Sequence, residues 1–137
     1  MPERVLFDLN VILDVIEARS PHLIHSGPAL ERAYRRDIQG VVSASSIDTL
    51  AFLLQRKLSA QRARRVIKDL LEFFEVATVS EQTIHRALDL KMKDLEDAIV
   101  YQAAVDDGCE CLVTRNLRDF PSSGSKPKII SPRMVGT

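Results

Sequence analysis

Short apolar runs alternate along this chain with longer segments whose apolar residues recur at helical spacing. Five runs have the length of strands, and they are residues 5–7, 41–43, 76–78, 111–113 and 129–130. Between the first four runs, apolar residues lie three and four positions apart, as Val66, Ile67 and Leu70 do. Strands that alternate with helices in this way form a mainly parallel sheet with helices on both faces. We therefore expect a three-layer α/β fold with a mainly parallel sheet of about five strands.

Residues that cap helices mark the expected helix boundaries. Residues 9–16 are apolar on nearly all sides, which is typical of a central helix. A second helix is expected at about residues 22–36, because a serine–proline pair breaks the first. Ser45 or Ser46 can cap the third helix. The later boundaries are expected at the caps Ser59, Ser80 and Asp94 and at the terminating glycine Gly108.

Length and composition are those of one globular domain. The 137 residues are 45% hydrophobic and 28% charged, and we expect a single domain over residues 1–137. The longest apolar stretch is far short of the roughly 20 residues that a membrane span needs. The first residues lack the pattern of a signal peptide, so a cytoplasmic location is expected.

Cysteine and histidine do not form a metal-binding pattern in this sequence. Cys109 and Cys111 are expected to be reduced thiols, because strand residues two positions apart are too distant for an easy disulfide. His22 and His25 fall on a helix that is expected to be exposed, so surface roles are expected for them. A zinc site would need more such residues close together.

Acidic residues gather where strands end or where a helix begins. Asp8 directly follows the first expected strand. Asp94 and Asp97 open a helix three positions apart, so both can face the same side. Asn116 and Asp119 come just after the fourth strand. Because parallel strands bring their carboxyl ends to one edge of a sheet, we expect these residues around one cleft. Such oxygen ligands suit a hard cation such as Mg²⁺ or Mn²⁺.

Each of these acidic residues can also fill an ordinary structural role. An aspartate after a strand can cap the next helix, although the neighbouring acids favour the ligand role for Asp8. Asp94 can cap its helix while Asp97 acts as a ligand, so both interpretations can hold together. Asp119 can equally be the cap of a short turn. Thr114 can hydrogen-bond a carboxylate and hold it in place.

Charge is balanced over the whole chain but not along it. The 19 basic and 19 acidic residues give a net charge of zero. Residues 56–68 carry six basic side chains and no acid, whereas residues 94–119 carry seven acids and two arginines. A basic flank near an acidic cleft suits an enzyme that acts on a phosphate backbone, and a solvated helix face is the plain alternative. The residues expected to contact phosphates are Arg64, Arg65 and Lys68.

Five segments together resemble the PIN domain family, and within it the bacterial toxin-type (VapC-like) nucleases. They are residues 7–14, 42–46, 94–99, 112–120 and 129–132. The resemblance implies a metal-dependent endoribonuclease that hydrolyses RNA phosphodiester bonds with Mg²⁺ or Mn²⁺. Asp8 and Asp97 would hold the ion, and Asp94, Asn116 or Asp119 would hold its waters or orient the nucleophile. The implied partners are single-stranded or looped RNA, a small antitoxin protein and a second copy of the chain in a homodimer.

Two positions depart from the family pattern. Thr49 stands where the family usually has a glutamate, on the helix after the second strand. Asn116 stands where an acid often follows the threonine–arginine pair. Both changes lower the negative charge expected around a divalent cation. The alternative hypothesis is therefore a PIN fold that binds RNA or a protein partner without cleaving.

Overall fold

The centre of the protein is a parallel sheet, seen in a computed structural model that describes residues 2–122 and 124–135. Its five strands are β1 (Arg4–Phe7), β2 (Gln39–Ser43), β3 (Phe74–Ala77), β4 (Cys111–Val113) and β5 (Lys128–Ile130). They lie in the order β3-β2-β1-β4-β5, and every neighbouring pair is parallel. The chain thus builds outward from β1 in one direction and then in the other. The carboxyl ends of β1 and β4 therefore meet at the switch point, where open sheets of this kind bind ligands.

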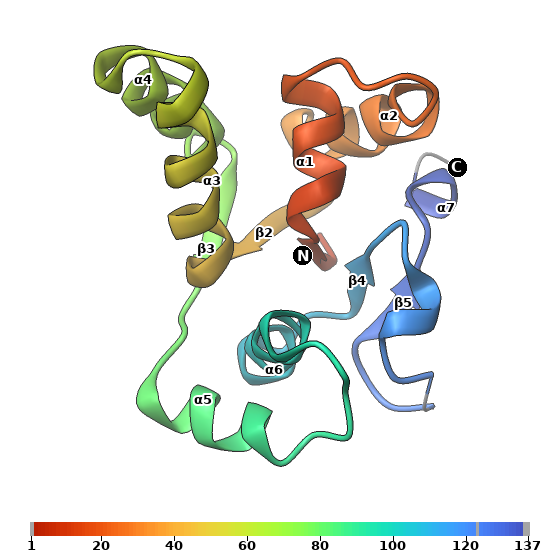
Figure 1. The fold of residues 1–137 in the computed structure, drawn as a ribbon. Coiled ribbons are helices and arrows are strands. Elements are labelled where there is room, and N and C mark those ends of the chain that lie inside the picture. The colour runs from red at the N-terminus through yellow and green to blue at the C-terminus, as the bar shows by residue number, and fades with distance from the viewer. Residues whose placement is uncertain (1, 123, 136–137) are drawn as a thin grey trace.

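Helices cover both faces of this sheet. They are α1 (Leu9–Ile16), α2 (Leu23–Tyr34), α3 (Ala44–Lys57), α4 (Ala60–Leu70), α5 (Glu81–Leu88), α6 (Leu95–Asp107), the 3₁₀ turn η1 (Leu117–Asp119) and α7 (Pro132–Val135). Figure 1 shows α1 to α4 on one side of the sheet and α5 and α6 on the other. The short α7 packs against α2. The three-layer α/β fold expected from the sequence is confirmed.

The side chains of the central strand alternate between two apolar cores. Val5 and Phe7 enter the core shared with α1 to α4, whereas Leu6 enters the core shared with α6. The rings of Phe7 and Phe74 meet edge to face with their centroids 5.2 Å apart. A shift of β1 by one residue would exchange the two faces and break both cores. Packing therefore fixes the position of Asp8 at the carboxyl end of the strand.

Several boundaries differ from the sequence-based prediction; β2, for example, begins at Gln39 rather than at residue 41. Ser43, rather than Ser45 or Ser46, caps α3, and its Oγ accepts the Ser46 amide at 3.1 Å. Strand β2 passes into α3 without a loop, so the last strand residue is also the cap. Strand β3 begins at Phe74 rather than at residue 76, because the Phe74 side chain belongs to the core beneath α1 to α4.

The other predicted caps are confirmed. Ser59, Ser80 and Asp94 cap α4, α5 and α6 with their side chains. Gly108 ends α6 in the left-handed conformation, with φ 76°, which an L-residue with a side chain rarely adopts. Among the described residues, no helix is both long and apolar enough to cross a membrane.

Candidate active site

The Asp8 carboxylate lies at the carboxyl end of the central strand, beside the end of β4. The Asp8 amide donates to the Val113 carbonyl at 2.9 Å, which continues the pairing of β1 with β4. Thr114 is fully buried, and its Oγ1 donates a hydrogen bond to Asp8 Oδ2 at 2.9 Å. The same Oγ1 accepts the Asn116 amide at 3.1 Å. Because a hydroxyl has one proton to donate, this arrangement orients Thr114 towards Asp8 and holds the carboxylate in place.

Burial raises the pKa of Asp8 above its usual range. The residue is 8% exposed, and loss of solvent is the largest influence on its ionisation. Hydrogen bonds from Thr114 and from the Leu9 backbone, together with the charge of Arg115, lower the pKa and partly offset this effect. The Asp119 carboxylate raises the pKa further. Asp8 is therefore a carboxylate whose ionised form would gain from a nearby cation.

The start of α6 supplies two more carboxylates. Asp94 is the cap, and its Oδ1 accepts the Asp97 amide at 2.9 Å. Asp97 lies in the first helical turn, where the helix dipole favours a negative charge. Its pKa is nevertheless raised to about 6, first by partial burial and then by the nearby carboxylates of Asp94, Asp8, Asp119 and Glu96. Acids just after β1, at the start of α6 and in η1 therefore lie close enough to influence one another.

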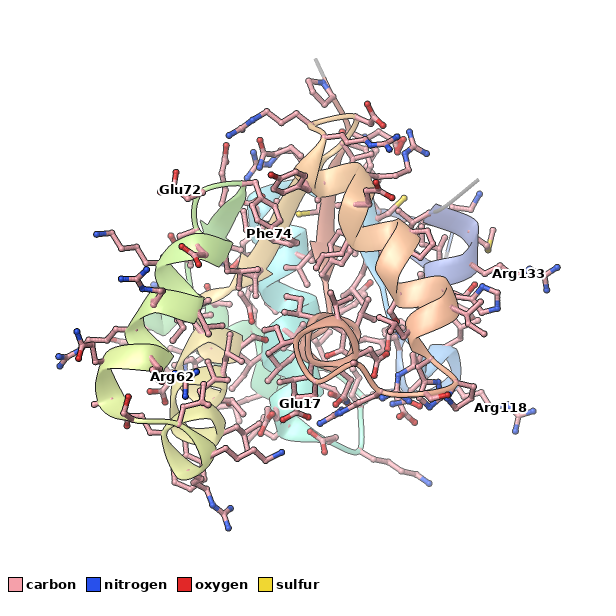
Figure 2. All side chains as sticks on the ribbon, turned by 90° about the horizontal axis from the view of Figure 1, so that it is seen from above. Glu17, Arg62, Glu72, Phe74, Arg118 and Arg133 are labelled. Atoms are coloured by element: carbon pink, nitrogen blue, oxygen red, sulfur yellow. The ribbon has the colours of Figure 1, made fainter. Side chains whose placement is uncertain are left out.

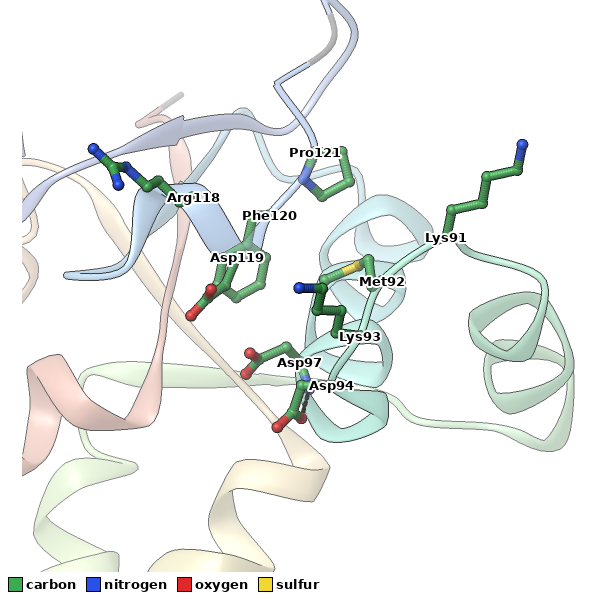
Figure 3. A pocket seen from close by; sticks show the side chains of 9 residues that line it. All are labelled: Lys91, Met92, Lys93, Asp94, Asp97, Arg118, Asp119, Phe120 and Pro121. Carbon is green, nitrogen blue, oxygen red and sulfur yellow. Dashed lines mark hydrogen bonds between the residues drawn. The ribbon is translucent and has the colours of Figure 1, made fainter.

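A cavity of about 830 Å³ opens beside these carboxylates, and we call it the acidic cavity. Asp94, Asp97 and Asp119 line it, and Figure 3 shows their carboxylates projecting to the same side. Lys91 and Lys93 also line it, and Lys91 extends away from the acids. These two lysines were not singled out in the sequence, where they precede the helix as ordinary loop residues. The remaining lining residues are Met92, Arg118, Phe120 and Pro121.

Two residues singled out in the sequence lie elsewhere. Asn116 is exposed and lines a second cavity together with His22 and Arg115. Thr49 is half-buried on α3, where its Oγ1 donates a hydrogen bond to the Ser45 carbonyl at 3.2 Å. The structure thus gathers the four aspartates at one edge of the sheet, but only Asp94, Asp97 and Asp119 line the acidic cavity, while Asp8 is buried close to them. Asn116 lies on the neighbouring surface.

The basic residues of α4 form an exposed face, which we call the α4 face. It consists of Arg64, Arg65 and Lys68, all of which are exposed. Figure 2 shows Arg62 of the same helix and Arg118 of the acidic cavity on opposite sides of the molecule. Contact between the α4 face and RNA remains a prediction.

A buried ion pair beside the site was not predicted. Asp14, in α1, is 0% exposed, and its Oδ2 lies 2.9 Å from Arg115 Nε. The same oxygen accepts a hydrogen bond from Ser26 Oγ at 2.8 Å. Arg115 Nη1 lies 3.2 Å from His22 Nε2, so His22 is half-buried rather than free on the surface as expected. The sequence signal is an aspartate within a helix that is apolar on nearly all sides, since a buried carboxylate needs a partner.

The donors at the acidic edge fit a hard divalent cation. All four aspartates offer oxygen ligands. The raised pKa values of Asp8 and Asp97 show that ionising these carboxylates is costly, and a bound cation would offset that cost. Within the described residues, no three His, Cys, Asp or Glu side chains converge closely enough to hold a metal ion. Mg²⁺ is commonly held by one or two carboxylates and several waters, so the residues present fit it without a closed cage.

The fold and the acidic edge define an α/β domain with a carboxylate site at the switch point of its sheet. The PIN domain family model matches residues 4–118, which run from β1 into η1. This chain therefore belongs to the PIN domain family, and the resemblance noted in the sequence is confirmed.

Toxin-type proteins are among the relatives of this chain. Ribonuclease VapC1 of Aquifex aeolicus (strain VF5) is 27% identical over 125 residues, which cover 88% of this chain and 85% of that protein. A toxin–antitoxin complex from Klebsiella pneumoniae has a chain that aligns with a TM-score of 0.69 and 25% identity, covering 93% of this chain and 97% of its own. DNA-bound VapBC from Salmonella typhimurium aligns with a TM-score of 0.67 and 19% identity, covering 96% and 99%. The similarity to VapC-like proteins thus extends over nearly the whole chain.

Proposed function

We propose that this protein is a metal-dependent endoribonuclease that acts in the cytoplasm as the toxin of a toxin–antitoxin pair. The observation that carries the proposal is the gathering of four aspartates at one sheet edge, where partial burial and then the charges of neighbouring carboxylates raise the pKa of Asp97 to about 6. The names of the relatives support it, since one is a ribonuclease and others come from toxin–antitoxin complexes. The reaction is hydrolysis of RNA phosphodiester bonds.

The aspartates divide the work between holding a cation and orienting water. Asp8 and Asp97 would hold Mg²⁺ or Mn²⁺, and the hydrogen bond from Thr114 keeps Asp8 in position. Asp94 has one oxygen engaged by the Asp97 amide, so the other is the one that can orient a water molecule. Asp119 is exposed and can do the same. When bound, the cation would supply Lewis acidity at the phosphate and lower the pKa of water.

The proposed substrate is single-stranded or looped RNA. Basic side chains line the acidic cavity beside the carboxylates and can offset phosphate charge. The α4 face is proposed to follow the RNA backbone farther from the cleaved bond. There its exposed basic side chains would contact phosphates without reading the nucleotide sequence. Asn116 remains a candidate for orienting water, because its backbone N–H donates to the Thr114 hydroxyl that holds Asp8.

Paired binding and cleavage assays test this function. Isothermal titration with Mg²⁺ and Mn²⁺ measures cation binding, and incubation with structured RNA, with and without EDTA, measures hydrolysis. We expect cation binding, and cleavage that is lost with EDTA and in the matched Asp8→Asn variant. Cation binding without cleavage of any RNA tested would favour the non-cleaving alternative. The neutral residues Thr49 and Asn116, at positions where the family resemblance implies acids, are the observation behind that alternative.

A small antitoxin is the proposed protein partner. An apolar hollow of about 240 Å³ lies between α1, α2 and Phe73, and offers such a partner a surface. Ile24 and Tyr34 of α2 are strongly exposed for apolar side chains. Co-expression with the product of the adjacent reading frame, followed by co-purification, tests this partner. A homodimer is also proposed, and light scattering of the purified protein measures it.

A further inference from the structure

A second cavity lies beside the acidic cavity and carries the opposite charge. Its volume is about 480 Å³, and its walls come from the start of α2, the link between β4 and η1, and the start of α7. The residues that determine its chemistry are His22, His25, Arg115, Asn116, Ser131 and Arg133. Because the described lining residues include two arginines and no carboxylate, we call it the basic cavity.

Arg115 is held in the wall of the basic cavity on two sides. Its side chain is 24% exposed, and its Nε forms an ion pair with Asp14 Oδ2 at 2.9 Å that lacks the alignment of a hydrogen bond. Its Nη1 lies 3.2 Å from His22 Nε2. A guanidinium that is already fixed loses little conformational freedom when it binds a ligand. Its remaining N–H groups can serve an anion, since guanidinium has five donors in a fork that matches phosphate oxygens.

The carboxylate that holds Arg115 is buried at a cost to stability. Asp14 Oδ2 also accepts the Ser26 hydroxyl, at 2.8 Å. Asp14 Oδ1 has no hydrogen-bond partner among the described residues and lies 4.0 Å from Arg19 Nη1. An incompletely satisfied buried carboxylate destabilises a fold, and an apolar side chain would suit this helix better. A buried carboxylate such as Asp14 is expected where it has to hold its partner, here Arg115, in a fixed position.

The basic and acidic cavities share one segment of chain. Arg115 follows Thr114, whose hydroxyl holds Asp8, and the charge of Arg115 acts on the Asp8 carboxylate. Arg118, three residues later, lines the acidic cavity. Figure 2 shows Arg118 and Arg133 projecting from the same side of the molecule. An RNA strand in the acidic cavity therefore meets a positively charged continuation on one side.

We propose that the basic cavity is a phosphate subsite that holds the RNA backbone next to the bond being cleaved, and that Asp14 is a positioning residue for Arg115. The inference rests on the proposed RNA substrate. Guanidinium groups bind phosphate through paired hydrogen bonds, and hydroxyl and amide donors suit the same group. A phosphate contact fixes the register of the strand without reading bases. The subsite therefore acts on every RNA sequence alike.

RNA binding without a divalent cation tests the subsite independently of cleavage. The probe is a fluorescently labelled single-stranded RNA, and its anisotropy gives the affinity at several salt concentrations. Arg115→Ala and Arg133→Ala should each weaken binding about tenfold, the usual scale for a lost hydrogen bond to a charged group. Each should also reduce the slope of log affinity against log salt by roughly 0.7.

A matched control removes the same charge away from the basic cavity. Arg35 is exposed and follows α2 at its far end, about 15 Å along the helix from His25. Arg35→Ala should leave the RNA affinity and the salt slope unchanged. Wild-type affinity in Arg115→Ala and Arg133→Ala, or weaker binding with the wild-type slope, overturns the subsite. If the cavity binds a carboxylate of a partner protein instead of RNA, Arg115→Ala and Arg133→Ala should bind RNA with the wild-type affinity.

Asp14→Asn tests the positioning role, because it keeps the shape of the side chain and removes its charge. The variant should match Arg115→Ala in RNA affinity and salt slope, and combining the two changes should add nothing. A lower melting temperature with the wild-type slope would overturn the positioning role. Arg133 is exposed on α7, so Arg133→Ala still tests the subsite if Asp14→Asn does not fold.

Failure of the proposed function looks different from failure of the subsite. If the protein is not a nuclease, the wild type binds RNA and the arginine variants bind it less well, but RNA stays intact with Mg²⁺ or Mn²⁺. If the subsite is wrong, the wild type cleaves RNA and the arginine variants bind it normally.

Discussion

The acidic cavity and the α4 face were both expected from charge in the sequence, but they are built in different ways. Beside the acidic cavity, Asp8 is buried and hydrogen-bonded to Thr114, and carboxylates from three parts of the chain act on one another. The basic residues of the α4 face are exposed side chains of a single helix. A preorganised site fails when one member is lost, whereas exposed charges act in small, nearly additive steps that salt screens.

The largest effect is expected from removing a carboxylate of the acidic edge. Asp8→Asn and Asp97→Asn should each lower the cleavage rate roughly 100-fold or more, since even partners of metal ligands matter 10- to 100-fold. Gel-based cleavage assays with Mg²⁺ and Mn²⁺ measure the loss. The metal-free variants should melt at the wild-type temperature or higher, because each lacks a carboxylate whose raised pKa disfavours its charge. Wild-type turnover would remove that residue from the catalytic set.

The hydrogen bond to Asp8 tests how much preorganisation matters. Thr114→Val keeps the shape of the side chain but removes the hydroxyl that orients Asp8. Cleavage and Mg²⁺ affinity should each fall about 10-fold or more. The pKa of Asp8 should rise further, because the lost hydrogen bond lowers it in the wild type. Thr114→Ser, which retains the hydroxyl, is the control and should stay near the wild type; equal behaviour of both variants would contradict the role.

Proton competition at Asp97 should make cation binding depend on pH. The pKa of Asp97 is raised from 3.8 to about 6, so the folded protein holds its proton more tightly than the unfolded chain does. The stability from Asp97 is therefore complete below pH 4 and lost as the pH rises through about 6. Cation affinity should weaken up to about tenfold per pH unit below this pKa. Calorimetric titrations from pH 5 to 7.5 measure this dependence.

The matched control for the pH effect is Asp97→Asn. Other carboxylates also titrate, so the informative quantity is the difference between the wild type and this variant. The fall in melting temperature of the metal-free protein between about pH 4 and 6 should be smaller in the variant. Parallel melting curves for the two proteins over this range would show that Asp97 does not have the raised pKa.

The α4 face should respond in smaller steps. The triple alanine variant of Arg64, Arg65 and Lys68 should bind every single-stranded RNA more weakly, and each lost phosphate contact should reduce the salt slope by roughly 0.7. Because the α4 face is exposed, the melting temperature should change little. Anisotropy titrations over a range of salt measure the slope. A wild-type slope would mean that the α4 face is only solvated or that it docks a protein.

The smallest effect is expected from adding an acid at position 49, where the family resemblance implies a glutamate. Thr49→Glu should strengthen Mg²⁺ or Mn²⁺ binding by roughly severalfold, because an added carboxylate raises the charge available to the cation. Thr49→Gln has nearly the same shape and no charge, so it is the matched control and should bind as the wild type does. Calorimetry measures both. Equal affinities in a folded protein would mean that position 49, which does not line the acidic cavity, is too far from the cation for its charge to act.

Local signals predicted most of the fold and the central part of the site. Asp8 was recognisable because a carboxylate directly after a buried strand emerges at the carboxyl edge of a parallel sheet. Asp94 and Gly108 were recognisable because capping depends on a few neighbouring residues. The cap of α3 was predicted at Ser45 or Ser46 instead of Ser43, because a run of serines does not show that the strand passes directly into the helix. Such boundaries are the least reliable part of local reasoning.

The sequence by itself determined the layers, the parallel sheet and the acidic edge, because hydrophobic period and strand-end position are properties of neighbouring residues. Only the tertiary structure decided which acids meet, how burial raises the pKa of Asp97 and which cavity Asn116 lines. It also joined Asp14 of α1 to Arg115 after β4, which are about a hundred residues apart in the chain. Such pairs depend on how separate elements pack, and desolvation depends on everything that surrounds a group.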